Sequence, residues 1–149
     1  MANSFISLHG KGLWISDIYL ELFAALFVAE LDERSQILPS WLHGIRKKYR
    51  IIQTGALSSF VNLEFDTFDQ NEERIFQYIL ILDCIVLRIK AGPKVIRKDH
   101  LNSNKQPDQS EWIEDLKASD IVHLVNCVRK IVLSDVATTS GDPDSYFIV

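Results

Sequence analysis

Apolar residues recur along much of this chain at the spacing of an α-helix. Between residues 13 and 33 they form two neighbouring rows in steps of four, one starting at Trp14 and the other at Ile15. Asp17 and Glu21 occupy the narrow face that remains. So wide an apolar surface is typical of a helix buried on most sides, and it predicts a first helix over 13–33.

A second helix is predicted from Pro39, because a proline in the first turn loses no hydrogen bond there. Trp41, Ile45 and Tyr49 share its apolar face, and Gly55 is the expected stop. The solvent side of this helix carries four basic residues, which are Arg46, Lys47, Lys48 and Arg50.

Residues 57–66 are the best strand candidate, because apolar and polar residues partly alternate there. A single strand is not stable, so this one needs a partner. The C-terminal sequence SYFIV and the sequence KVI around Val95 are the two candidate partners.

The sequence FDTFDQNEERIF, residues 65–76, places four acids before a strongly apolar run. Asp69 and Glu72 match a capping box, in which the aspartate accepts from a first-turn N–H and the glutamate reaches back. The helix that they open is predicted to be central and to stop at Gly92-Pro93. The many β-branched residues of YILILDCIVLRI leave a β-segment as the alternative.

Asp108-Gln-Ser-Glu111 repeats the capping pattern and predicts a short helix over EWIEDLK. A last helix is predicted from Ser119-Asp120, with an apolar stripe that His123 faces away from. The fold class expected is a mainly α bundle of four to five helices with a small β element, or alternatively α+β. Residues 1–149 are expected to form a single domain.

Composition limits the cellular compartments and the classes of binding partner that are expected for this chain. The chain has 149 residues, is 47% hydrophobic and carries a net charge of −4, which argues against nucleic acid as the main partner. Cys84 and Cys127 lie in apolar segments and are expected to be buried free thiols, which suits a cytoplasmic protein. No signal peptide and no membrane-spanning run is recognised, so no membrane partner is expected.

Two acidic groups are the candidate sites. The first contains Asp66, Asp69, Glu72 and Glu73, and the second contains Asp108, Glu111, Glu114 and Asp115. Helix capping and solvation explain the first group without any function, a protein-docking patch is the functional interpretation, and a metal or catalytic site is a third alternative. The spacing of its acids does not match a calcium loop. Asp83, inside the apolar run, is expected to be buried and paired with Arg88 or Arg129, with a catalytic acid as the alternative.

No motif identifies a reaction. The chain lacks a Gly-rich phosphate loop, a GxSxG, HExxH or CxxC motif, and a histidine pair at metal-ligand spacing. We therefore expect no catalytic residues, no metal and no cofactor.

In overall character the chain resembles the immunity proteins of bacterial toxin systems, in particular those of contact-dependent growth inhibition. The resemblance lies in YRIIQTGALSSFVNLEFDTFDQNEERIF, which combines a helix end, a strand-like segment and an acidic helix start. It implies a cognate protein toxin as the partner, often a basic nuclease, whose active site or substrate groove is blocked. The two acidic groups are then the expected contact residues, and the oligomeric state stays open.

Two other classes of function remain open. One is a helical regulatory or nucleic-acid-binding adaptor domain that uses the basic residues of the second helix. The other is a small enzyme that uses Asp83 or the acidic cluster.

Overall fold

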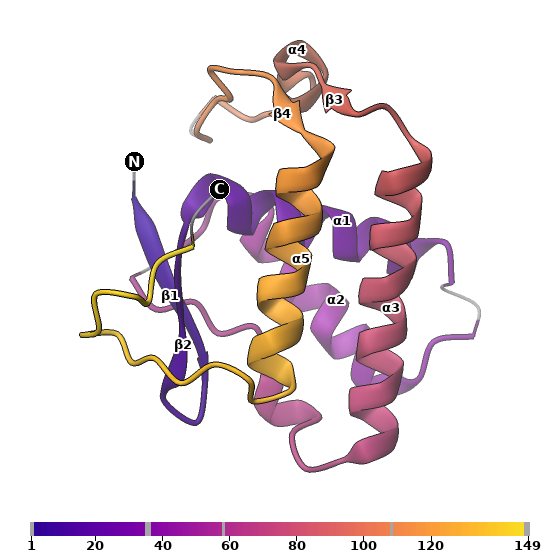
Figure 1. Cartoon of the computed structure of the whole chain (residues 1–149). Coiled ribbons are helices and arrows are strands. Elements are labelled where there is room, and N and C mark those ends of the chain that lie inside the picture. The colour runs from indigo at the N-terminus through magenta and orange to yellow at the C-terminus, as the bar shows by residue number, and fades with distance from the viewer. Residues whose placement is uncertain (1, 35–36, 58, 108, 148–149) are drawn as a thin grey trace.

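The computed structural model describes residues 2–34, 37–57, 59–107 and 109–147. Within these ranges the chain forms five α-helices and two antiparallel two-stranded sheets, and 51% of the residues are helical (Figure 1). The elements in chain order are β1 (Asn3–Leu8), β2 (Lys11–Ser16), α1 (Asp17–Asp32), α2 (Ser40–Ile52), a 3₁₀ turn η1 (Phe65–Thr67), α3 (Glu72–Ala91), β3 (Val95–Ile96), α4 (Lys98–Asn102), β4 (Leu116–Lys117) and α5 (Ala118–Val132). The expectation of a mainly α fold with a small β element is confirmed.

The N-terminal segment forms a β-hairpin, so the prediction of a helix from residue 13 is wrong at its start. His9 and Gly10 both have positive φ, which is the backbone geometry of a tight two-residue hairpin turn. Gly12 leaves no room for a side chain, because an added Cβ would collide with the Ile6 carbonyl oxygen. The helix begins only at Asp17, once the chain has left the hairpin.

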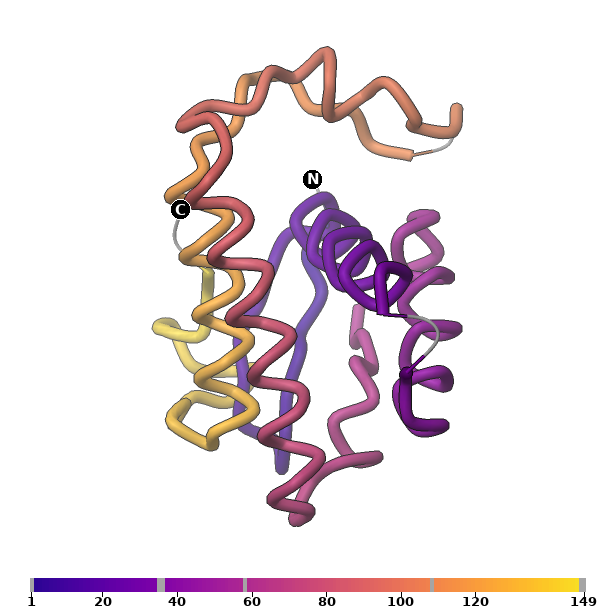
Figure 2. Tube along the Cα trace, turned by 90° about the vertical axis from the view of Figure 1, so that its right-hand side faces the viewer, coloured from indigo at the N-terminus to yellow at the C-terminus, as the bar shows by residue number. Residues whose placement is uncertain are grey.

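The central helix of the fold is α1, whereas the sequence predicts α3 for that place. Leu20, Phe23, Phe27 and Leu31 of α1 are completely buried. α1 packs against α2, α3 and α5, and Figure 1 shows it crossing behind α3 and α5. These two helices run side by side, as Figure 2 also shows. The apolar run of α3 is therefore covered on one face only.

α3 begins with a different cap from the one predicted. The N-cap is Asn71, whose side-chain oxygen accepts from the Arg74 N–H at 3.1 Å, so the assignment of this role to Asp69 is wrong. The predicted stop at Gly92 is confirmed, and the β-segment alternative is excluded. In α5 the predicted apolar stripe is buried as expected.

In the segment expected as a strand over 57–66, the described residues 57 and 59–66 do not form a strand in a sheet. The segment makes one isolated bridge, between Phe60 and Phe5, and then enters η1. The alternation of apolar and polar residues has another cause. Val61, Leu63 and Phe65 are buried in the core, whereas the residues between them are not buried.

The two predicted partner segments pair elsewhere. β3, within KVI, pairs with β4, and Tyr146 of the C-terminal tail bridges to Trp14 of β2. The tail also packs Phe147 against the rings of Tyr19 and His123.

The short helix expected over 111–117 is absent. Residues 111–115 are irregular, and Leu116 and Lys117 form β4. The preceding helix α4 was not anticipated. Asp108, the expected cap of the missing helix, lies outside the described residues. The capping pattern failed here because no apolar face of sufficient length follows it.

Candidate protein-binding surface

Three carboxylates of the first acidic group are exposed at the start of α3. Asp66 lies on η1, and Glu72 and Glu73 lie in the first turn of α3. All three residues are exposed, and their side chains have no hydrogen bond or ion pair with any residue that the structure describes. We call these three residues the acidic ridge.

Asp69, the fourth residue of this group, is engaged within the fold. Its carboxylate lies 2.8 Å from Nε2 of His9 in the turn of the N-terminal hairpin. The sequence places Asp69 and Glu72 together in a capping box, whereas in the structure Asp69 contacts the hairpin and Glu72 stays exposed.

The acidic ridge is held on a rigid support. Phe65 and Phe68 anchor both ends of η1 in the core, and Phe68 stacks on Tyr78 of α3 with ring centroids 4.5 Å apart. The guanidinium of Arg74 donates to the Thr67 carbonyl oxygen at 2.7 Å and lies over the ring of Trp41. Arg74 therefore ties η1 to α3, and its charge is directed back toward the protein.

The second acidic group lies at the other end of α3. Glu111 and Glu114 are exposed, whereas the carboxylate of Asp115 accepts from the Lys98 N–H at 2.9 Å and fixes the start of α4. α3 has 20 residues and is therefore about 30 Å long. The structure does not bring the two acidic groups together (Figure 1).

Next to the acidic ridge, α3 presents large apolar side chains to solvent. Phe76 is 62% exposed, Leu80 is 41% exposed and Leu87 is 67% exposed. Ile37, which is 82% exposed, borders a shallow groove of about 190 Å³ together with Leu80. Apolar residues surrounded by charged ones are typical of protein–protein interfaces.

Two buried glutamates of α1 were not recognised in the sequence. Glu21 is buried and its Oε2 lies 2.9 Å from Nζ of Lys105, beside a cavity of about 200 Å³ that Trp112 also lines. Glu30 is buried between the guanidinium groups of Arg34 and Arg88, each 3.0 Å away. The only signal in the sequence was that both acids interrupt an apolar run. Both carboxylates have structural cation partners.

Asp83 pairs with Arg129 of α5, one of the two partners predicted for it. The expected burial is wrong, because the Asp83 side chain is 44% exposed. Arg88, the other expected partner, binds Glu33 through two hydrogen bonds of 2.6 Å, and these contacts lower the pKa of the Glu33 carboxyl group. Asp83 thus has the geometry of a surface ion pair.

The basic face of α2 is partly neutralised. Arg46 and Arg50 both approach Asp32 of α1, whereas Lys47 and Lys48 are exposed. These contacts leave less free positive charge for nucleic acid than the sequence suggests.

The two thiols differ in their surroundings. Cys127 is buried, which raises the pKa of its thiol. Cys84 is only half-buried, and Nη2 of Arg34 lies 2.8 Å from its Sγ. Both cysteines are free thiols, as expected. The expected burial is confirmed for Cys127 alone.

In the described ranges, no group of three or more His, Cys, Asp or Glu side chains is arranged to hold a metal ion. Among the helices of the same ranges, none combines the length and the apolar character that a membrane crossing requires. Comparison of the chain with protein-family models, with curated proteins and with solved structures found no match.

Proposed function

We propose that this protein is an immunity protein that binds a cognate protein toxin and neutralises it by blocking its active site or substrate groove. The acidic ridge carries the proposal. Asp66, Glu72 and Glu73 are exposed and have no side-chain partner in the described part of the chain. They lie on η1 and in the first turn of α3, which Arg74 ties together. The toxin that fits such a surface best is a nuclease.

The chemistry of a nuclease explains this choice. A substrate groove that binds phosphates is lined with lysine and arginine, and clustered carboxylates offer it the same kind of negative charge. An acidic surface also speeds association with a basic partner through long-range attraction, and the net charge of −4 has the right sign.

Rigidity supports the same proposal. A surface that is already ordered loses little conformational entropy on binding. The acidic ridge meets this condition because Asn71 caps α3 and Arg74 ties η1 to it. Phe76, one turn after Glu72 on α3, adds an exposed apolar contact beside the carboxylates.

The test is a charge reversal with a matched control. The variant Asp66→Lys/Glu72→Lys changes the acidic ridge, and Glu111→Lys/Glu114→Lys makes the same change in net charge at the other end of α3. Each is titrated against the protein encoded beside this gene, at several salt concentrations, and assayed for protecting cells that express that protein. We expect the first variant to lose at least about tenfold in affinity and much of its salt dependence, and the control to lose less than about threefold.

Equal affinities of the wild type and the ridge variant would reject the acidic ridge as the binding surface. An absence of any binding or protection by the wild type would reject the immunity function itself. Retention of the wild type on heparin at moderate salt, with loss of retention after Lys47→Glu/Lys48→Glu, would instead support a nucleic-acid-binding adaptor.

A further inference from the structure

The solvent face of α3 carries a heptad pattern that the fold leaves uncovered. Glu73, Phe76, Leu80, Asp83, Leu87 and Lys90 follow one another in alternating steps of three and four residues. This spacing places them in one line along the helix, as in the seam of a coiled coil. We call these six residues the α3 stripe. Its three apolar members are all exposed, Phe76 and Leu87 by more than half and Leu80 by 41%.

We propose that the α3 stripe is a self-association surface, on which a second copy of this chain docks with its α3 antiparallel. In that arrangement a two-fold axis passes between Leu80 and Asp83. Phe76 of one copy then lies opposite Leu87 of the other, and Leu80 lies opposite Asp83. At the two ends of the seam Glu73 lies opposite Lys90, so both outer layers pair opposite charges.

Charge complementarity identifies the occupant and its direction. The stripe is acidic at its N-terminal end and basic at its C-terminal end, so it is complementary to its own reverse. A parallel pair would instead place Glu73, Asp83 and Lys90 each against its own copy, which makes three layers of like charge, and like charges across a helix seam are destabilising.

The borders of the stripe suit a helix–helix contact. On one border Arg129 of α5 pairs with Asp83, which is itself a member of the stripe. The charge of Asp83 therefore already has a partner when the seam closes. On the other border Trp41 donates to Gln77 and Arg88 binds Glu33. Polar groups with satisfied hydrogen bonds thus flank an apolar line, which is the order found across interfaces.

The size of the seam predicts a weak dimer. One helix face of about 30 Å per copy falls at the lower end of specific interfaces, where association is transient. We therefore expect a dissociation constant on the order of tens of micromolar. Asp66 lies outside the seam, on η1, whereas Glu73 and Phe76 belong to both proposed surfaces. Self-association is measured on the free protein without a toxin, so the failure of either proposal can be told from the failure of the other.

The first experiment measures mass by sedimentation equilibrium over a concentration series. Leu87→Glu places a charge opposite Phe76 in two layers, and we expect it to weaken the dimer by at least about 30-fold. Ile113→Glu introduces the same charge at a residue that is 80% exposed and lies outside α3, and should leave the dimer unchanged. A wild type that stays monomeric up to about millimolar concentration, or a dimer that survives Leu87→Glu, would overturn the proposal.

The second experiment tests the direction of the helices. Glu73→Lys alone and Lys90→Glu alone each turn two attractive end pairs into repulsive ones, and should weaken the dimer about tenfold. The double variant restores opposite charges across the seam and should return to within about threefold of the wild type.

The same double variant should lower the unfolding temperature of the monomer, because both changes oppose the dipole of α3. Recovery of association in a less stable chain cannot come from a general gain in stability. Single variants that associate like the wild type would rule out the antiparallel pairing.

Discussion

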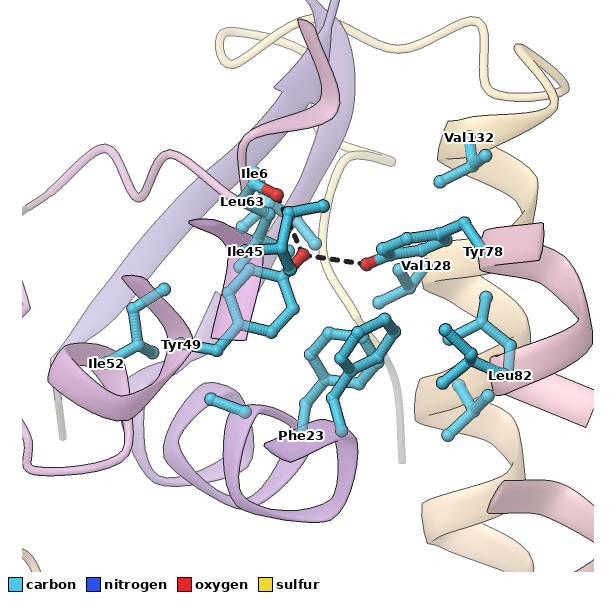
Figure 3. Close-up of a cluster of buried hydrophobic side chains, with 14 of the residues drawn as sticks. Ile6, Phe23, Ile45, Tyr49, Ile52, Leu63, Tyr78, Leu82, Val128 and Val132 are labelled. Atoms are coloured by element: carbon cyan, nitrogen blue, oxygen red, sulfur yellow. Dashed lines mark hydrogen bonds between the residues drawn. The ribbon is translucent and has the colours of Figure 1, made fainter. Parts of the chain in front are cut away.

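The hydroxyl oxygens of Tyr49 and Tyr78 lie 2.8 Å apart in the completely buried centre of the protein. Tyr49 comes from α2 and Tyr78 from α3, and Figure 3 shows them meeting between the apolar side chains of the core. The Tyr49 hydroxyl also donates to the Leu63 carbonyl oxygen at 2.7 Å. Since a carbonyl can only accept, Tyr78 must be the donor to Tyr49. The pair joins α2, α3 and the 57–66 segment.

This order of donors predicts unequal effects of two similar substitutions. Tyr49→Phe removes both hydrogen bonds and leaves the Leu63 carbonyl and the Tyr78 hydroxyl without their partner, so it should cost about 2–3 kcal/mol of unfolding free energy. Tyr78→Phe removes one bond and should cost about 1 kcal/mol. Urea denaturation of both variants and of the double variant measures these costs. A larger loss for Tyr78→Phe would reverse the assigned direction of the bond.

The tyrosine pair also predicts a loss of stability at alkaline pH. Burial raises the pKa of both tyrosines. Below the pKa of a tyrosine in the unfolded chain, about 10, both hydroxyls are protonated in the native and in the unfolded protein, so the pair contributes its full stability to the native state. Above that pH the unfolded chain releases protons that the native state retains, and each tyrosine should cost about 1.4 kcal/mol per pH unit until its folded pKa is reached.

Urea denaturation from about pH 8 to 11 measures this dependence. The variant Tyr49→Phe/Tyr78→Phe, which has no ionisable group at this position, is the control and should lose less stability over the same interval. Parallel pH profiles of the wild type and the double variant would contradict the assignment to this pair.

The Glu21–Lys105 pair predicts a large effect from a residue in a loop. The Glu21 side chain is 6% exposed and the Lys105 side chain is 13% exposed. Lys105→Met leaves a buried carboxylate without its cation and should cost about 3 kcal/mol. Glu21→Gln/Lys105→Met removes both charges and should be more stable than the single variant. Thermal and urea unfolding of both variants provide the comparison.

A surface pair serves as the control for this prediction. Arg50 and Asp32 are both about half exposed, so Arg50→Met should cost less than about 1 kcal/mol. Similar costs for Lys105→Met and Arg50→Met would mean that the cavity beside Glu21 admits enough water to solvate the carboxylate.

The start of α3 gives a direct test of which residue caps the helix. Asn71→Ala should cost about 1 kcal/mol, because the Arg74 N–H loses its acceptor. Asp69→Ala removes only the partly exposed contact with His9 and should cost less than about 0.5 kcal/mol. Denaturant midpoints of the two variants decide between the caps, and a larger cost for Asp69→Ala would favour the capping box expected from the sequence.

The acidic ridge was only partly predictable. The sequence indicated that acids gather before α3 and that Asp66 and Glu73 have no role in a capping box. It could not show that Asp69 contacts His9, because these two residues are 60 positions apart and only the tertiary fold brings the hairpin turn to the segment after η1. The α3 stripe was also hidden, since every apolar residue of the run was counted as core.

The sequence by itself determined most of the helices, including the C-terminal end of α3 and the buried stripe of α5. These properties are local, since apolar residues three and four apart share a face and a Gly-Pro pair ends a helix wherever it occurs. The tertiary structure alone decided that residues 11–16 form a strand, that the described residues 59–66 do not, and that α1 occupies the centre. Each of these depends on which distant segment covers an apolar face, and periodicity shows that a face is apolar without showing what will pack on it.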